Sequence, residues 1–85
     1  MNIAILGYGT IGKGVFEIVN NRSDITVLKI LERPERVDEK YKDLFVSSIE
    51  EIVKDENIDL VVEVLAVTTY FLLYMAFVIQ FLAKS

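Results

Sequence analysis

Three glycines join an apolar run to an amphipathic stretch near the start of the 85-residue chain, and their spacing limits the folds open to it. The preceding run, from Ile3 to Leu6, is continuously apolar, as is typical of a parallel strand buried on both faces. After the glycines, apolar residues recur at helical spacing, at Ile11, Val15, Ile18 and Val19. The hydrophobic period therefore changes within a few residues, which predicts a strand, a tight turn and a helix in direct succession.

The glycines Gly7, Gly9 and Gly12 have the G-x-G-x-x-G spacing of a dinucleotide-binding turn. In such a turn the first glycine permits the sharp bend, the second lets the backbone approach a pyrophosphate, and the third lets the helix pack closely on its strand. The freed amides and the positive end of the helix dipole would face the phosphates. We therefore expect a nucleotide-binding turn, the alternative being a strand-to-helix connection without a ligand.

An acidic residue follows the glycine turn at the separation typical of dinucleotide sites. Glu32 lies about 20 positions after Gly12, at the end of the apolar run from Ile25 to Leu31. Its carboxylate would accept hydrogen bonds from the adenosine ribose and repel a 2'-phosphate, which favours NAD over NADP. Arg33 and Arg36 argue for NADP, because a guanidinium can grip a phosphate in a fork. The alternative interpretation of Glu32 is an exposed charge in an acidic loop.

The remaining segments alternate strand and helix patterns. The second strand should end before Pro34, which has no amide hydrogen to donate to a sheet. Residues 44–46 predict a short third strand, and two overlapping Ser-x-x-Glu capping boxes between Ser47 and Glu51 predict a helix after it. The run from Asp59 to Leu65 predicts a fourth strand. This alternation predicts an α/β fold, a partial Rossmann-type doubly wound parallel sheet of about four strands.

Composition excludes several classes of function. The net charge of -4 and the dispersed basic residues argue against a nucleic-acid partner. The chain has no cysteine and no histidine, which excludes thiol catalysis, disulfides and the usual zinc sites, and we expect no metal. Gly12-Lys13 is followed by Gly14, so the phosphoryl-transfer lysine motif does not occur. The first apolar segment is short and lacks a basic lead, so no signal peptide is indicated and we expect a cytoplasmic protein.

Two charged residues are weaker candidates for a ligand site. Glu63 interrupts the apolar fourth strand near its carboxyl end, where it could face the ligand cleft of an open sheet. A partly solvated carboxylate paired with a lysine is the favoured alternative. Lys13 follows the glycine turn and is more simply interpreted as an exposed helix charge than as a phosphate ligand.

Taken together, these segments resemble the amino-terminal NAD(P)-binding domain of homoserine dehydrogenase. The matching segments are IAILGYGTIGKGVFEIV, ITVLKILER and SSIEEIVKDENIDLVVEVL, within residues 2–65. The resemblance implies an oxidoreductase that converts homoserine to aspartate semialdehyde with NAD or NADP, in threonine and methionine biosynthesis. It also implies two groups of cofactor-binding residues: Gly7, Gly9, Thr10, Ile11 and Gly12 at the pyrophosphate, and Glu32 and Arg33 near the adenosine ribose.

The resemblance ends after the fourth strand. The family continues with a glycine pair near the nicotinamide ribose, a helix and a Thr-x-Asn-Lys segment, whereas Ala66 and Val67 stand at the place of the glycines here. We therefore expect a truncated cofactor domain over residues 1–65, without the substrate and dimerisation region or the family's catalytic lysine and acid. No catalytic residue is assigned. The alternative is a non-catalytic interaction or membrane-associated module with a vestigial nucleotide turn.

The last residues of the chain are unusually apolar. From Val64 to Ala83 there are 20 residues without a charge, a length that could span a membrane. The pattern predicts an apolar helix over residues 66–85 with aromatic side chains on its outer face. It could pack on the sheet of a truncated or altered product and leave a self-associating patch, or be buried against another copy or a missing partner chain. Membrane insertion is disfavoured because the segment leads directly out of a sheet strand.

Overall fold

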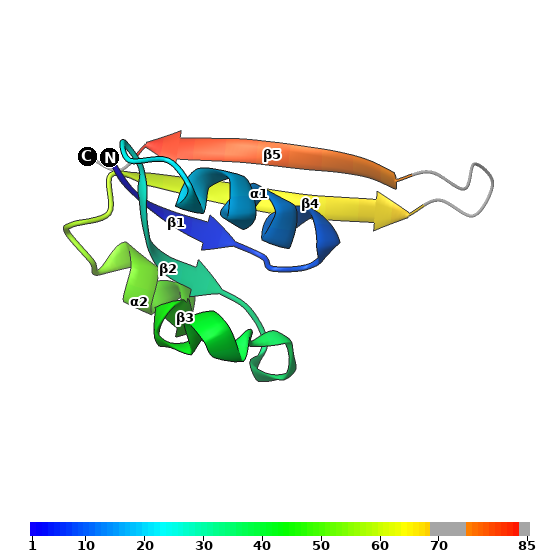
Figure 1. Cartoon of the computed structure of the whole chain (residues 1–85), viewed down its shortest axis with the longest axis horizontal. Helices are drawn as coiled ribbons and strands as arrows, with labels where there is room; N and C mark the ends of the chain where they lie inside the picture. Colours follow the sequence, from blue (N-terminus) through cyan, green and yellow to red (C-terminus); the bar gives the residue numbers. More distant parts are fainter. Residues whose placement is uncertain (69–74, 84–85) are drawn as a thin grey trace.

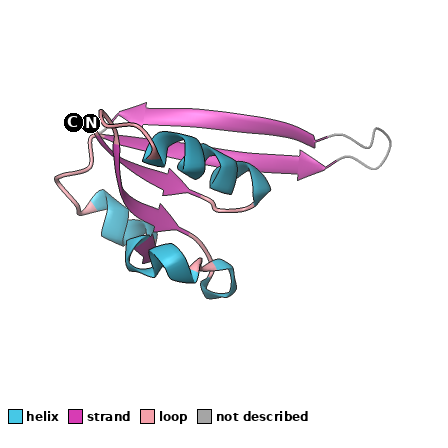
Figure 2. Cartoon of the chain, viewed as in Figure 1, coloured by secondary structure: helices cyan, strands magenta, loops and turns pink. Residues whose placement is uncertain are grey.

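The computed structural model describes residues 1–68 and 75–83, with side chains over residues 1–64. The elements in chain order are β1 (Asn2–Leu6), α1 (Thr10–Asn20), β2 (Thr26–Leu31), the 3-10 helices η1 (Pro34–Arg36) and η2 (Glu39–Leu44), β3 (Phe45–Val46), α2 (Ile49–Val53), β4 (Leu60–Thr68) and β5 (Met75–Ala83). Figure 1 traces this order along the chain, and Figure 2 separates helices from strands.

One sheet of five strands, in the order β3-β2-β1-β4-β5, forms the centre of the molecule. The pairs β1–β2, β1–β4 and β2–β3 are parallel, whereas β5 pairs antiparallel with β4. The order of the four parallel strands is that of the first four strands of a classic dinucleotide-binding sheet. The predicted partial Rossmann-like α/β fold is therefore confirmed, and the observed strands begin and end close to the predicted ones.

The apolar helix predicted over residues 66–85 is wrong where the structure describes that segment. β4 continues to Thr68, and Met75–Ala83 form β5, in register from Leu60 opposite Ala83 to Thr68 opposite Met75. A continuous apolar run does not by itself distinguish a buried helix from a strand. Here the free edge of β4 offers backbone partners to a segment rich in β-branched and aromatic residues. The remainder of the predicted helix, residues 69–74 and 84–85, lies outside the described residues.

Side chains pack on both faces of the sheet, which we call the α1 side and the α2 side after the helix on each. The buried cluster on the α1 side comprises Ile3, Ile5, Tyr8, Phe16, Val27, Ile30, Val62 and Val64. The cluster on the α2 side comprises Ala4, Ile52, Ile58 and Val61. Among the described helices, none is long and apolar enough to cross a membrane.

Backbone hydrogen bonds bring the carboxyl ends of three strands together. Gly7, just after β1, donates its amide to the carbonyl of Leu31 at the end of β2, with N···O 2.9 Å. Glu32 donates its amide to the carbonyl of Val46 at the end of β3, with N···O 3.2 Å. Since ligands of open parallel sheets bind outside the carboxyl ends of the strands, these bonds position the residues of the candidate site.

Candidate functional site

The glycine turn after β1 depends on glycine for two separate reasons. Gly7 has φ +108°, a conformation that side-chain-bearing residues rarely adopt, and an added Cβ would lie 3.0 Å from the carbonyl oxygen of Val64. An added Cβ on Gly12 would overlap the carbonyl oxygen of Gly7 and lie 2.8 Å from its carbon. The absence of these side chains therefore lets α1 start directly against the end of β1.

The first turn of α1 keeps its amides available. Gly9 is the N-cap residue, no side chain of the described residues caps the helix, and its first turn contains no acidic residue. The first intrahelical bond joins the amide of Lys13 to the carbonyl of Gly9, at 2.8 Å. The amides of Thr10, Ile11 and Gly12 thus precede the helical ladder, where the helix dipole favours an anion.

This turn borders a small cavity of about 170 Å³, which we call the hollow. Its lining comprises Gly7, Gly9, Thr10, Ile11, Gly12, Glu32, Arg36 and Val64. The structure thus brings together six of the seven residues that the sequence predicts as cofactor-binding. The seventh, Arg33, lies instead in a neighbouring depression of about 360 Å³, lined by Leu31, Glu32, Arg33, Pro34 and Ser47.

Glu32 borders both cavities, and its carboxylate is held by two backbone amides. Oε2 accepts from the amide of Tyr8 at 2.7 Å, and Oε1 accepts from the amide of Arg33 at 2.9 Å. Burial alone would raise the pKa of Glu32, but these amides together with the charge of Arg36 outweigh it and hold the pKa below its ordinary value. The carboxylate therefore stays ionised at neutral pH and fixes the first bend of the glycine turn.

Tyr8 is a site residue that the sequence analysis missed. It occupies the variable position between Gly7 and Gly9, yet its side chain is only 7% exposed. Its ring makes edge contacts with Phe45 at 4.9 Å and Phe16 at 5.8 Å between centroids. A tyrosine between two glycines gives no sign in the sequence of whether it points inward, so no local signal could have identified it.

The hydroxyl of Tyr8 connects the glycine turn to the segment after β2. It donates to Oδ2 of Asp38 at 2.9 Å. Burial, reinforced by the Asp38 carboxylate, raises the pKa of Tyr8 above its ordinary value, and the same hydrogen bond lowers the pKa of Asp38. Tyr8 thus stays protonated at neutral pH and Asp38 ionised, as this bond requires.

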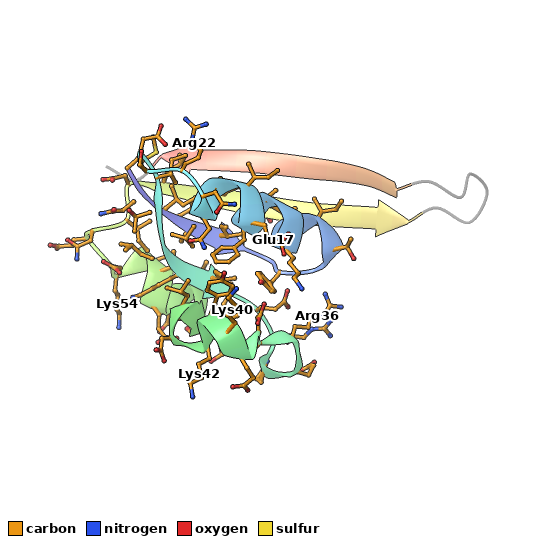
Figure 3. All side chains as sticks on the ribbon, in the orientation of Figure 1. Glu17, Arg22, Arg36, Lys40, Lys42 and Lys54 are labelled. Atoms are coloured by element: carbon orange, nitrogen blue, oxygen red, sulfur yellow. The ribbon has the colours of Figure 1, made fainter. Side chains whose placement is uncertain are left out.

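Arg36 lines the hollow from that same segment. The short helix η1 places it there, with the amide of Arg36 bonded to the carbonyl of Arg33 at 2.9 Å. Its Nη1 lies 3.3 Å from where a Cβ on Gly9 would be. Figure 3 shows its side chain on the side of the molecule where α1 begins. The sequence analysis considered Arg36 only as a partner for a 2'-phosphate, because contact with Gly9 depends on the path of a charged loop.

The two weaker candidates lie away from the hollow. Glu63 pairs in register with Leu6 and is half-buried, but Val64 is the β4 residue that lines the hollow. Because Val62 and Val64 belong to the α1-side core, strand alternation puts Glu63 on the α2 side. Lys13 is exposed on α1, as expected of a solvated helix charge.

Comparison with known proteins agrees with this geometry. The family model described as homoserine dehydrogenase, NAD binding domain, matches residues 7–83. Homoserine dehydrogenase of Lactococcus lactis subsp. lactis (strain IL1403) is 35% identical over an alignment of 79 residues, and the match covers 76% of this chain and 18% of that protein. No solved structure matches the chain. Because the family model covers most of its length, the chain belongs to the homoserine dehydrogenase family through the NAD-binding domain.

Proposed function

We propose that this chain binds the pyrophosphate of NAD or NADP in the hollow, as the cofactor-binding part of a homoserine dehydrogenase. The observation that carries the proposal is the uncapped first turn of α1, which borders the hollow at Gly9. Backbone amides at a helix start, with no side chain between them and a ligand, form an anion site. The match to the family's NAD-binding domain supports the same ligand class.

Each predicted residue has a role in this proposal. Gly7 and Gly12 shape the turn, and Gly9 lets the pyrophosphate approach the backbone. Thr10 and Ile11 contribute their amides from the first turn of α1. A hollow of about 170 Å³ is too small for a whole dinucleotide, so the adenosine would extend into the neighbouring depression beside Arg33. Glu32 borders both cavities, which suits a contact with the ribose between them.

We further propose that NAD is preferred to NADP. The lowered pKa of Glu32 keeps a negative charge at the proposed ribose position, where it would repel a 2'-phosphate. Arg33 lies on the adenosine side, but its guanidinium is 3.7 Å from the carboxylate of Glu35, which offsets its charge.

The oxidation of homoserine belongs, in this proposal, to the enzyme as a whole. The chain spans about a fifth of the length of the Lactococcus relative, so we assign cofactor binding to residues 1–65 and no catalytic role to any residue. We place this function in the cytoplasm, in line with the dinucleotide cofactor and the absence of cysteine.

Calorimetric titration with NAD and with NADP tests the proposal. Saturable binding is expected, tighter for NAD, and should be lost in Gly9→Val because the side chain would fill the approach to the pyrophosphate. A Cβ at position 9 meets only the flexible end of Arg36, so the fold should persist. Gly14→Ala is the matched control in the same helix, since an added Cβ there has no atom within 4 Å.

Absence of heat from either cofactor, in a sample whose circular dichroism shows it folded, would contradict the proposal. That result would favour the non-catalytic interaction module as the function of the chain. Binding that survives Gly9→Val would place the ligand elsewhere on the molecule.

A further inference from the structure

Among the described residues that line the hollow, Arg36 carries the only positive charge. Its guanidinium approaches Gly9, with Nη1 3.3 Å from the position of an added Cβ. In a dinucleotide turn this is the glycine whose backbone the pyrophosphate approaches most closely. The guanidinium is therefore at the pyrophosphate end of the proposed site, away from the depression that Arg33 lines.

Arg36 also differs from the other two described arginines, because each of those forms an ion pair. Arg22 is 2.8 Å from the carboxylate of Asp24, and Arg33 is 3.7 Å from that of Glu35. Within the described part of the chain, Arg36 forms no such ion pair, although its charge acts on Glu32 through space. Its planar set of donors is thus open to an incoming anion.

Two contacts just after Arg36 in the chain hold its segment against the glycine turn and α1. Two residues after it, Asp38 accepts the buried hydroxyl of Tyr8 at 2.9 Å. Further along, the ring of Tyr41 packs edge-on against Phe16 of α1, with centroids 4.7 Å apart. These contacts fix the backbone near Arg36 without occupying its guanidinium, so little ordering of that backbone would remain when a ligand binds.

We infer that Arg36 binds the pyrophosphate of the cofactor, opposite the amides of the α1 start, and does not select for a 2'-phosphate. The inference rests on the proposed function and adds a side-chain contact to a site otherwise made of backbone. It requires that Arg36 contributes equally to NAD and NADP binding, because both contain the pyrophosphate.

The test compares Arg36→Gln with Arg22→Gln in the whole chain, by calorimetric titration with NAD and with NADP. Arg36→Gln should weaken both cofactors about tenfold, as loss of one charge-assisted contact predicts. Its binding should also depend less steeply on salt. Arg22→Gln, which removes an arginine that lines neither cavity, should change NAD affinity by no more than about twofold. Arg36 is exposed, so thermal unfolding should be unaltered in the variant.

Three results would overturn the inference. A loss confined to NADP would assign Arg36 to the 2'-phosphate. Unchanged binding of both cofactors by Arg36→Gln would remove Arg36 from the site while leaving the proposed function standing. A folded wild-type chain that binds neither cofactor would overturn the inference together with the proposed function.

Discussion

The two sides of the sheet differ in how they are built. On the α1 side, an 11-residue helix packs on a core cluster that includes the rings of Tyr8 and Phe16. On the α2 side, a five-residue helix covers a smaller cluster, and an ion pair between Lys29 and Asp55, at 3.1 Å, lies beside it. The hollow opens at the start of α1, so the side with the larger core also carries the candidate site. This contrast indicates that changes on the α2 side can lower stability without altering the site.

The largest difference in stability between the two sides should come from truncating one buried isoleucine on each side. Ile30 is 0% exposed on the α1 side, and Ile52 is 1% exposed on the α2 side. Ile30→Ala should lower the free energy of unfolding by about 4 kcal/mol, because paired strands prevent the cavity from closing. Ile52→Ala should cost about 2 kcal/mol, because a five-residue helix can shift into the space. Urea denaturation measures both, and equal losses would contradict the contrast.

The glycines of α1 give a second, smaller test. Gly12→Ala should lower the free energy of unfolding by about 1–3 kcal/mol, since its Cβ would overlap the backbone of Gly7 and push α1 away from β1. Gly14→Ala meets no atom within 4 Å and should stabilise the helix by up to about 1 kcal/mol. Thermal unfolding of the two variants should therefore move in opposite directions. A stabilising Gly12→Ala would show that α1 does not contact the turn as described.

The ion pair on the α2 side should matter less. Nζ of Lys29 bonds to the carboxylate of Asp55 and donates to the carbonyl of Glu51 at 2.9 Å, in a partly buried setting. Lys29→Met should cost about 1 kcal/mol of stability and leave NAD affinity unchanged. The exposed pair of Arg22 and Asp24 is the control, and Arg22→Met should leave the stability nearly unchanged. A change in NAD affinity with Lys29→Met would show that the sides are coupled.

The smallest effect is a dependence of stability on pH that arises on the α1 side. Folding lowers the pKa of Glu32 and of Asp38 below their ordinary values of 4.5 and 3.8. A carboxyl whose folded pKa is lowered stabilises the protein above its ordinary pKa, and this contribution is lost as the pH falls through the folded value. The temperature of the thermal unfolding midpoint should therefore fall as the pH is lowered below about 4.5. Glu32→Gln should make this fall smaller. If the stability of Glu32→Gln depended on pH as steeply as that of the wild type, Glu32 would not be a source of this dependence.

The sequence was sufficient to predict the structure where that structure follows from local requirements of the backbone. The strand, the glycine turn and the helix adjoin one another in the chain, and with the later alternation of strand and helix patterns they predicted the fold class. The family was predicted from the resemblance of three segments of the chain to homoserine dehydrogenase. The spacing also selected the turn residues and Glu32, which the structure gathers around one hollow. These residues meet because β1 and β2 are parallel and adjacent, so that the residues after each strand lie at the same edge of the sheet.

Sequence was insufficient where two distant segments determine each other. The hydrogen bond of Tyr8 to Asp38 and the approach of Arg36 to Gly9 both depend on the path of residues 33–44, whose charged sequence has no periodicity. The apolar run after β4 predicted a helix, but the structure has β5, because the available edge of β4 is a tertiary feature. Hydrophobicity required that run to be covered without specifying its secondary structure.

The most direct test of the central claim is an amide NMR titration of the isotope-labelled chain with NAD. If the pyrophosphate binds at the start of α1, the largest shifts should fall on Gly9, Thr10, Ile11 and Gly12, with smaller shifts at Glu32 and Arg36. The chemical shifts of the α2 amides should not change. Shifts that instead centre on α2, or that are absent in a folded sample at millimolar NAD, would contradict the account.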